Sequence, residues 1–237
     1  MKVLILHLSD LHIDTQTLTG KISPIVDIVK NLEYQLDRAF IVVTGDISLS
    51  GEEEQISNAF QFLDELSRML EENLSSLQDK DKVKTNIIII PGNHDCYLQE
   101  KDAVRKILAN GILKDKNAAN NGTVIDQCLK AQETFFEYRD TYLENGLINK
   151  GKIYYEYKFS DNDENIIFKC INTAWMSQRE EQQGEIVYPV SKIQNNRGDE
   201  TLTITLFHHP YPWLEAENGR QFRKKIESLS DIILTGT

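Results

Sequence analysis

The sequence predicts an α/β protein built around a parallel sheet. Short runs of apolar and β-branched residues, which are typical of strands buried on both faces, recur along the 237 residues. The first three runs are separated by segments whose apolar residues have helical spacing, and this alternation indicates a β-α-β-α-β unit. The hydrophobic content of 40% is sufficient for one large buried core. We therefore expect a single α/β domain over residues 1–237.

The individual elements follow from the same patterns. The apolar runs predicted to be strands are VLILHL (3–8), FIVVTG (40–45), NIIIIPG (86–92), NIIFKCINT (165–173), TLTITLF (201–207) and DIILTG (231–236). YYEYKF (154–159), together with the runs at 165–173 and 201–207, predicts a second sheet with some antiparallel neighbours. Helices are predicted over 23–36, 52–74 and 128–143, with a polar loop near 116–122. The polar stretch 180–200 is expected to be irregular or to hold a short helix.

Charge and cysteine content restrict the function classes. The formal net charge of −11 weighs against extended duplex nucleic acid and favours a small or single-stranded substrate. An anionic substrate remains compatible, because bound cations can reverse the local sign of charge. No apolar stretch approaches the roughly 18 to 20 residues of a membrane span, so we expect no membrane crossing. Three cysteines without C-x-x-C spacing predict neither a disulfide framework nor a zinc knuckle, and they favour a reduced, cytoplasmic setting.

The N-terminal run is short for a signal peptide and leads into SDLH instead of a small-residue cleavage site, so we expect it to be retained. The chain contains no P-loop, no G-x-S-x-G and no G-x-G-x-x-G pattern. ATP-driven work, serine hydrolysis and dinucleotide redox chemistry are therefore not indicated. The oligomeric state is left open.

Polar side chains follow the ends of the predicted strands. SDLH, TGD and PGNHD follow the first three, and HHP follows the strand at 201–207. Ligand sites of α/β sheets lie outside the carboxyl ends of the strands, which predicts that these residues converge. The converging set is Asp10, His12, Asp46, Asn93, His94 and Asp95, joined by His208 and His209.

The donor types in this set point to metal binding. Carboxylate, imidazole and amide oxygen together suit Mn, Fe or Zn better than an all-oxygen metal. Several carboxylates indicate two divalent ions, for which we favour Mn, with Fe, Zn, Ni or Mg as alternatives. Asp46 follows Gly45, which allows a tight backbone turn, and is placed to bridge two ions.

The order D-x-H, G-D, G-N-H-D and H-x-P, from Asp10 to Pro210, resembles the calcineurin-like metallophosphoesterase superfamily. The resemblance implies a two-sheet αββα sandwich, with mixed sheets flanked by helices and a binuclear metal site at one edge. It makes Asp10 and His12 ligands of one metal, Asp46 the bridge, and Asn93 and His208 ligands of the other. It also implies that His94 protonates the leaving oxygen, that Asp95 orients the His94 imidazole, and that a metal-bound hydroxide is the nucleophile.

The family pattern includes a further G-H-x-H after a late strand, whereas DIILTG is followed here by Thr237. We expect residues 1–237 to lack the C-terminal part of the domain that carries this motif. The main hypothesis is a metal-dependent hydrolase of phosphoesters, acting on cyclic nucleotides, other small phosphodiesters, nucleic-acid ends or phosphoproteins. The alternative is a catalytically silent metal- or nucleotide-binding regulatory module, fused to further domains of a larger protein.

Several other residues have both a structural and a functional interpretation. His209 is expected to pack behind the site, although it could replace His208 as a ligand. Tyr211 and Trp213 are expected to pack within their loop, and Cys96 is expected to be an inert buried thiol. The basic cluster from Arg220 to Lys225 is expected to be a solvated helix face, with a phosphate contact as the alternative.

Overall fold

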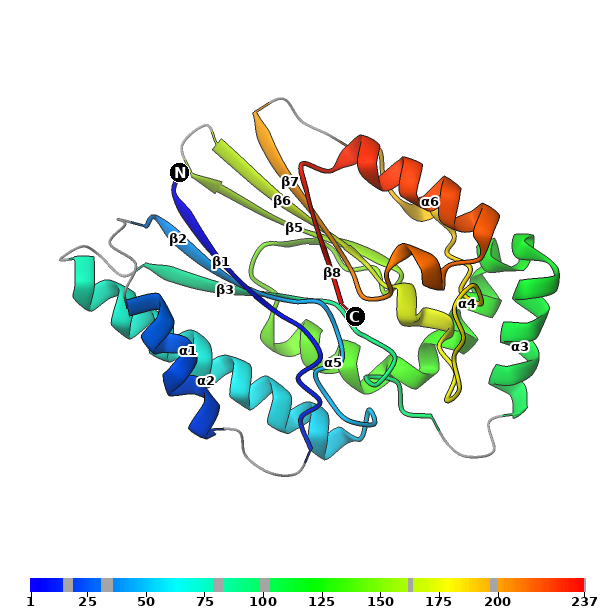
Figure 1. Cartoon of the computed structure of the whole chain (residues 1–237), viewed down its shortest axis with the longest axis horizontal. Coiled ribbons are helices and arrows are strands. Elements are labelled where there is room, and N and C mark those ends of the chain that lie inside the picture. Colours follow the sequence, from blue (N-terminus) through cyan, green and yellow to red (C-terminus); the bar gives the residue numbers. More distant parts are fainter. Residues whose placement is uncertain are drawn as a thin grey trace.

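The computed structural model describes residues 1–14, 19–30, 36–78, 83–98, 103–161, 164–196 and 200–236. Two β-sheets pack face to face, and helices cover their outer sides (Figure 1). The architecture is the α/β two-sheet sandwich expected from the resemblance. One sheet is parallel and the other is mixed.

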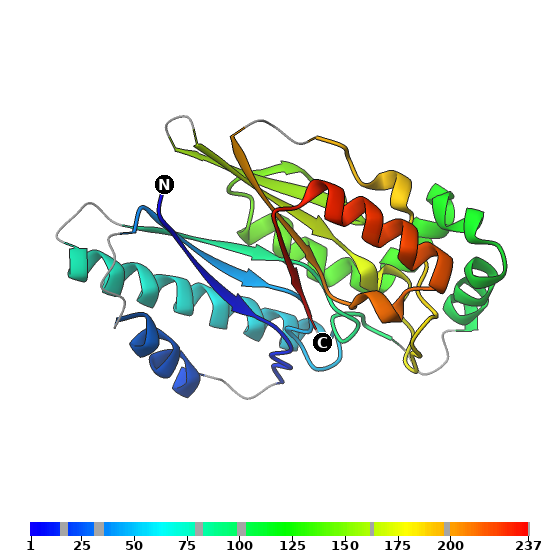
Figure 2. The ribbon, with the colours of Figure 1, turned by 45° about the horizontal axis from the view of Figure 1, so that its top comes forward.

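The first sheet is a parallel β-α-β-α-β unit. β1 (Val3–Leu8), β2 (Arg38–Val43) and β3 (Lys84–Ile89) pair in the order β1-β2-β3. The crossovers contain α1 (Thr19–Lys30) and α2 (Glu53–Gln78), which lie together on the outer face of this sheet (Figure 2). The predicted unit is confirmed. The helix predicted over 23–36 is found as far as Lys30, and residues 31–35 lie outside the described residues.

The second sheet has the order β4-β5-β6-β7-β8. Its strands are β4 (Leu147–Asn149), β5 (Tyr154–Asp161), β6 (Glu164–Ile171), β7 (Thr201–Phe207) and β8 (Ile232–Thr235). The pairs β4-β5 and β5-β6 are antiparallel, whereas β6-β7 and β7-β8 are parallel. The remaining helices are α3 (Ala103–Lys114), α4 (Gly122–Leu129), α5 (Glu133–Tyr142) and α6 (Ala216–Leu229).

Aromatic side chains fill the space between the two sheets. The ring of Phe40 on β2 lies 5.0 Å from that of Phe159 on β5 and 4.8 Å from that of Phe168 on β6, measured between centroids. The hydroxyl of Tyr155 on β5 donates to the carbonyl of Ile89 at the end of β3, at 2.6 Å. These contacts fix the position of one sheet relative to the other. A site built from loops of both sheets requires such a fixed position.

The outer strands β1 and β8 correct one expectation. Both were expected to be buried on both faces, yet most residues of β1 are only half-buried and Ile232 of β8 is 38% exposed. Within the described residues each lies at an edge of its sheet, so neighbouring elements cover only part of its surface.

The helix predicted over 128–143 is interrupted. α4 ends at Leu129, a 3₁₀ turn covers Lys130–Gln132, and α5 follows. Long-range hydrogen bonds explain the break, because the Ala131 carbonyl accepts from the Tyr97 N–H at 2.7 Å and the Gln132 side chain is bonded to Asn172. The expected polar loop near 116–122 instead contains a 3₁₀ helix, Lys116–Asn120, and the stretch 180–200 contains the expected short helical turn, Val190–Lys192.

Within the described part of the chain, no helix combines the length and the apolar character that crossing a bilayer demands.

Candidate metal centre

The predicted site residues lie where strands of both sheets end. Asp10 and His12 follow β1, Asp46 follows β2, and Asn93 and His94 follow β3. His208 follows β7 of the second sheet directly. Backbone hydrogen bonds tie the first two loops together, because the N–H groups of Asp10 and His12 donate to the carbonyls of Gly45 and Asp46 at 3.1 and 3.0 Å.

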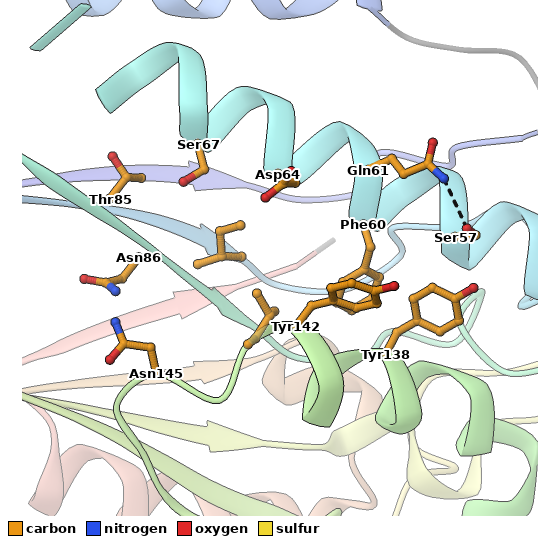
Figure 3. A pocket seen from close by; sticks show the side chains of 12 residues that line it. Ser57, Phe60, Gln61, Asp64, Ser67, Thr85, Asn86, Tyr138, Tyr142 and Asn145 are labelled. Atoms are coloured by element: carbon orange, nitrogen blue, oxygen red, sulfur yellow. Dashed lines mark hydrogen bonds between the residues drawn. The ribbon is translucent and has the colours of Figure 1, made fainter. Parts of the chain in front are cut away.

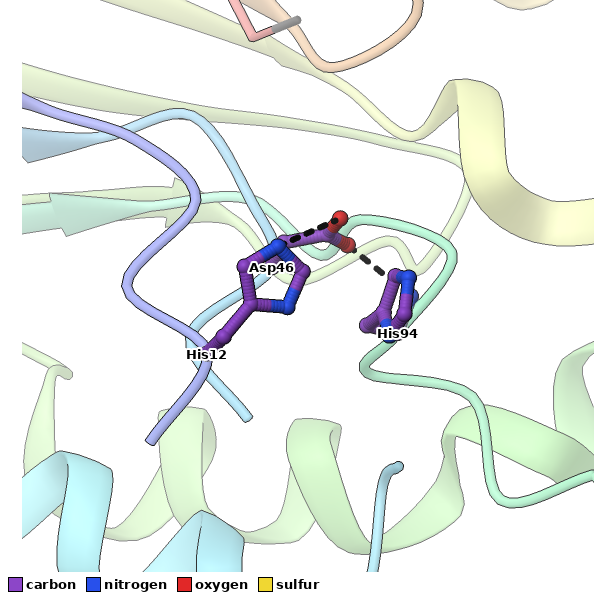
Figure 4. A group of neighbouring side chains, drawn as sticks. All are labelled: His12, Asp46 and His94. Carbon is purple, nitrogen blue, oxygen red and sulfur yellow. Dashed lines mark hydrogen bonds and ion pairs between the residues drawn. The ribbon is translucent and has the colours of Figure 1, made fainter. Parts of the chain in front are cut away.

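Asp46 lies at the centre of the group. Its Oδ2 is 3.9 Å from Nε2 of His12 and 3.5 Å from Nε2 of His208, and its Oδ1 accepts from the His94 backbone N–H at 2.8 Å. Figure 4 shows His12 and His94 on either side of the carboxylate. Two sets of candidate ligand atoms share Asp46, namely His12 with His94 and Asp10 with His208, each set within 4.8 Å. The geometry therefore has the form of a double site with one common carboxylate.

This grouping differs in detail from the ligand sets that the resemblance implies. The resemblance pairs Asp10 with His12 and does not make His94 a ligand, whereas the clustered atoms group Asp10 with His208 and His12 with His94. Asn93 does join His208, since its Oδ1 lies 2.9 Å from His208 Nε2.

His208 is in the protonation state that a metal ligand needs. Its Nδ1 lies 2.8 Å from the Thr44 carbonyl, so Nδ1 donates and Nε2 carries the lone pair. Burial, reinforced by the neighbouring His209, lowers the pKa of His208 to about 4, so the ring is neutral at pH 7. Nε2 then faces Oδ1 of Asn93, so two hydrogen-bond acceptors lie in contact with no proton between them. A cation bound by both atoms would make this contact favourable.

Two further features fit a cation. The Nδ1 atom of His12 is buried and has no hydrogen-bond partner among the described residues. Burial raises the pKa of Asp46, and the nearby Asp10 carboxylate acts in the same direction. A bound cation would offset the cost of the buried negative charge of Asp46.

The backbone of the site is strained at three of these residues. Asp10, His12 and Asp46 have φ of 56°, 45° and 55°, in the left-handed region. Each such residue costs on the order of 1–2 kcal/mol, and strain of this kind gathers at functional sites. Gly45 has φ of 99°, so the tight turn expected before Asp46 is confirmed.

Gly92 allows the loop after β3 to approach Asp46. A Cβ atom at this position would lie 2.1 Å from Asp46 Oδ1. A side chain of any size here would displace the central carboxylate.

The Asp95 carboxylate, expected to orient the His94 imidazole, bonds to groups on two neighbouring loops. Its carboxylate accepts from the N–H and hydroxyl of Ser48, at 2.9 and 3.0 Å, and from the Gly92 N–H at 2.9 Å. Burial, with Asp46 nearby, raises the pKa of Asp95 to about 6. The His94 imidazole is held instead by the Leu49 carbonyl, 2.7 Å from Nδ1. Asp95 thus ties two loops together, and a backbone carbonyl orients His94.

His209 lies behind the site and is 2% exposed. Its Nε2 is 3.2 Å from Oε2 of Glu181, and its Nδ1 is 3.1 Å from the Thr173 hydroxyl. Trp213 packs near it, with ring centroids 5.6 Å apart. Burial, the largest single influence, opposes ionisation of Glu181, but the hydrogen bond from His209, the nearby charge of its ring and further hydrogen bonds together lower the pKa of this carboxyl.

Sequence reasoning missed the supporting residues Thr44, Ser48, Leu49 and Glu181. Ser48 follows Asp46 by two positions and could have been suspected, whereas the carbonyls of Thr44 and Leu49 have no residue signature.

Cys96 is buried, and burial raises the pKa of its thiol to about 12, as expected of an inert cysteine. Arg220, Arg223 and Lys224 are exposed on α6, and Arg223 pairs with Glu227 at 2.7 Å, as expected of a solvated face.

Comparison with known families agrees with this geometry. The family model described as calcineurin-like phosphoesterase matches residues 3–236. The protein therefore belongs to the calcineurin-like phosphoesterases. Membership supports metal-dependent hydrolysis of phosphoesters in general, and the clustered side chains supply candidate metal ligands. A search of curated proteins found no match to this chain.

Proposed function

We propose that the protein hydrolyses phosphoesters with a binuclear centre held by Asp10, His12, Asp46, Asn93 and His208. The observation that carries the proposal is the position of Asp46, whose single carboxylate lies between His12 and His208. Asp10, His12, Asp46 and Asn93 lie in loops that follow strands of the parallel sheet. His208 follows β7 of the second sheet. When bound, the two divalent cations lower the pKa of water and neutralise negative charge that develops on the phosphate.

His94 is proposed as the general acid. Its Nδ1 donates to the Leu49 carbonyl, which leaves Nε2 as the atom that can deliver a proton to the leaving oxygen. The backbone N–H of His94 donates to Asp46, so the acid is positioned relative to the proposed bridge. The ring also lies against that of His12, with centroids 4.5 Å apart.

The mixed nitrogen and oxygen donors favour Mn as the activating ion. The net charge of −11 favours small or single-stranded phosphoesters over extended duplexes. We further propose that residues 1–237 act as one domain, since strands of both sheets contribute to the same group of side chains. The free cysteines Cys96, Cys128 and Cys170 support the proposal of a reduced, cytoplasmic setting.

The test is hydrolysis of bis-p-nitrophenyl phosphate by metal-stripped protein before and after addition of Mn²⁺. We expect hydrolysis after addition of Mn²⁺ and loss of activity on renewed chelation. Activity that survives exhaustive chelation would contradict the mechanism. Bound metal per chain should be measured in the same samples, because metal binding without hydrolysis of diesters or monoesters would favour the alternative, a catalytically silent module.

A further inference from the structure

A second concave site lies between α2, β3 and the end of α5, away from the candidate metal centre. It is a pocket of about 530 Å³, within the range of roughly 300–1,000 Å³ that is usual for small-molecule sites. It is formed in part by Thr85, Asn86 and Ile87 in the first half of β3, whereas the proposed ligands follow the other end of the strands. Asn86 lies three residues, about 10 Å, before the last residue of β3. The two sites share no residue.

One wall of the pocket is aromatic. Phe60 on α2 and Tyr138 on α5 have ring centroids 5.4 Å apart, and Tyr138 and Tyr142 have centroids 5.7 Å apart with planes inclined by 31°. Figure 3 shows these three rings together at one end of the pocket. The ring of Tyr142 also lies 6.2 Å from that of Phe60, measured between centroids, and the residue is 66% exposed. The wall presents flat apolar surface on which a planar ligand can stack.

The other wall carries hydrogen-bonding groups. The hydroxyl of Thr85 is buried and has no partner within the described chain. The Oδ1 atom of Asn86 accepts from Arg38 at 3.1 Å, which leaves its NH₂ group to face the pocket, and the amide of Asn145 lies opposite it (Figure 3). The NH₂ group of Asn86 can donate, and the amide of Asn145 can both donate and accept, so the two match a ligand edge that carries donors and acceptors.

The charge of the lining restricts the ligand further. Among the described residues that line the pocket, Asp64 supplies a carboxylate and none is a lysine or arginine. A phosphate group on the ligand would meet the carboxylate of Asp64, while the guanidinium of Arg38 lies outside the lining and is bonded to Oδ1 of Asn86.

We propose that this pocket binds a neutral nucleobase or nucleoside. The ring of the ligand stacks on the wall of Phe60, Tyr138 and Tyr142, and its polar edge bonds to the side-chain amides of Asn86 and Asn145. The proposal is separate from the phosphoester chemistry, because a nucleoside has no phosphoester bond and the pocket contains no proposed metal ligand.

The test is calorimetric titration of adenosine into metal-stripped, chelator-treated protein. We expect saturable binding of one adenosine per chain, and weaker binding of adenosine monophosphate. Loss of one stacking ring costs about 1–3 kcal/mol, so Tyr142→Ala should weaken binding by roughly 5- to 150-fold. Tyr142→Phe keeps the ring and should bind within about twofold of the unmodified protein. Tyr97→Ala removes an exposed tyrosine outside the pocket and should change nothing.

Three results would overturn the proposal. They are absence of binding at millimolar adenosine, binding that Tyr142→Ala leaves unchanged, and binding that requires metal, which would place adenosine at the other site. Tyr142 is largely exposed, so its removal should not unfold the chain. If Tyr142→Ala nevertheless lowers the melting temperature, Asn145→Ala decides the matter, because it removes a polar contact from a loop position and must weaken binding.

Discussion

At the residue scale, Asp46 joins more of the site than any other side chain described. Its two carboxylate oxygens contact groups from three loops, and its own carbonyl accepts from the His12 N–H. The residue achieves this with a left-handed backbone, after a glycine that allows the turn. The position is therefore sensitive to small changes around it.

His94→Ala should leave metal content nearly unchanged and lower turnover by roughly 10²- to 10⁴-fold, the usual effect of losing a general acid. The loss should be smaller for p-nitrophenolate, which leaves without a proton, than for an alkoxide. Steady-state rates on paired aryl and alkyl phosphodiesters measure this difference. Equal losses for both leaving groups would assign His94 a positioning role.

Gly92→Ala should reduce metal content and activity, because the added methyl group would lie 2.1 Å from Asp46 Oδ1. We also expect a loss of stability of about 1–3 kcal/mol from overpacking. Gly111→Ala is the matched control, since a Cβ there meets nothing within 4 Å and lies in the interior of α3. That variant should gain about 0.5–1 kcal/mol and keep its metal. Normal metal binding by Gly92→Ala would contradict this, because it would show that the loop after β3 can move away from Asp46 without loss of the site.

At the scale of elements, the strand ends were the part of the site that the sequence could predict. Apolar runs mark β1, β2, β3 and β7, and the polar residues after them meet because parallel strands end at one edge. The orienting carbonyl of Leu49 was not predictable, since every residue has a carbonyl. The break between α4 and α5 was hidden for a related reason, because the Tyr97 N–H that bonds to Ala131 comes from a distant loop. The half-burial of β1 and β8 depends on their position in the sheet order, which apolar runs do not encode.

The strands β5 and β6 are joined by a buried ion pair. Glu156 and Lys169 are 1% and 0% exposed, face each other in register, and lie 2.8 Å apart. The Glu156 carboxylate also accepts from Tyr154 and Asn196. Burial alone would raise the pKa of Glu156, but these hydrogen bonds and Lys169 together lower it.

Lys169→Met should destabilise the protein by about 3–5 kcal/mol, because it leaves a buried carboxylate without its cation. In the unmodified protein, the lowered pKa of Glu156 contributes stability above the pKa of the unfolded chain, and this contribution is lost as the pH falls. Lys169→Met should reverse that sign, so that acid partly restores the missing stability. Urea unfolding from about pH 3 to pH 8 measures both effects, because the contribution of Glu156 in the unmodified protein is lost only below its unfolded-chain pKa of 4.5.

The double variant with Glu156→Gln and Lys169→Met is the control for the ion pair. It removes both charges and should recover most of the stability lost in the single variant. A double variant as unstable as Lys169→Met would show that packing of the lysine stem, not its charge, supports the sheet.

At the scale of the whole molecule, the two sheets are needed together. The parallel sheet supplies Asp10, His12, Asp46 and Asn93, and the mixed sheet supplies His208. The contacts of Phe40 with Phe159 and Phe168 hold the sheets in register with each other. The family match over residues 3–236 spans both sheets, in agreement with a site that belongs to the whole sandwich.

The central claim is that one carboxylate, Asp46, joins two metal sites, and bound metal per chain in Asp46→Asn tests it most directly. A neutral amide is a poor bridge between two cations, so elemental analysis should find both metals reduced together, with phosphodiester hydrolysis falling in parallel. Asp64→Asn, an exposed change of the same kind on α2, should keep the metal content and rate of the unmodified protein. Metal content of Asp46→Asn equal to that of the unmodified protein would contradict the account.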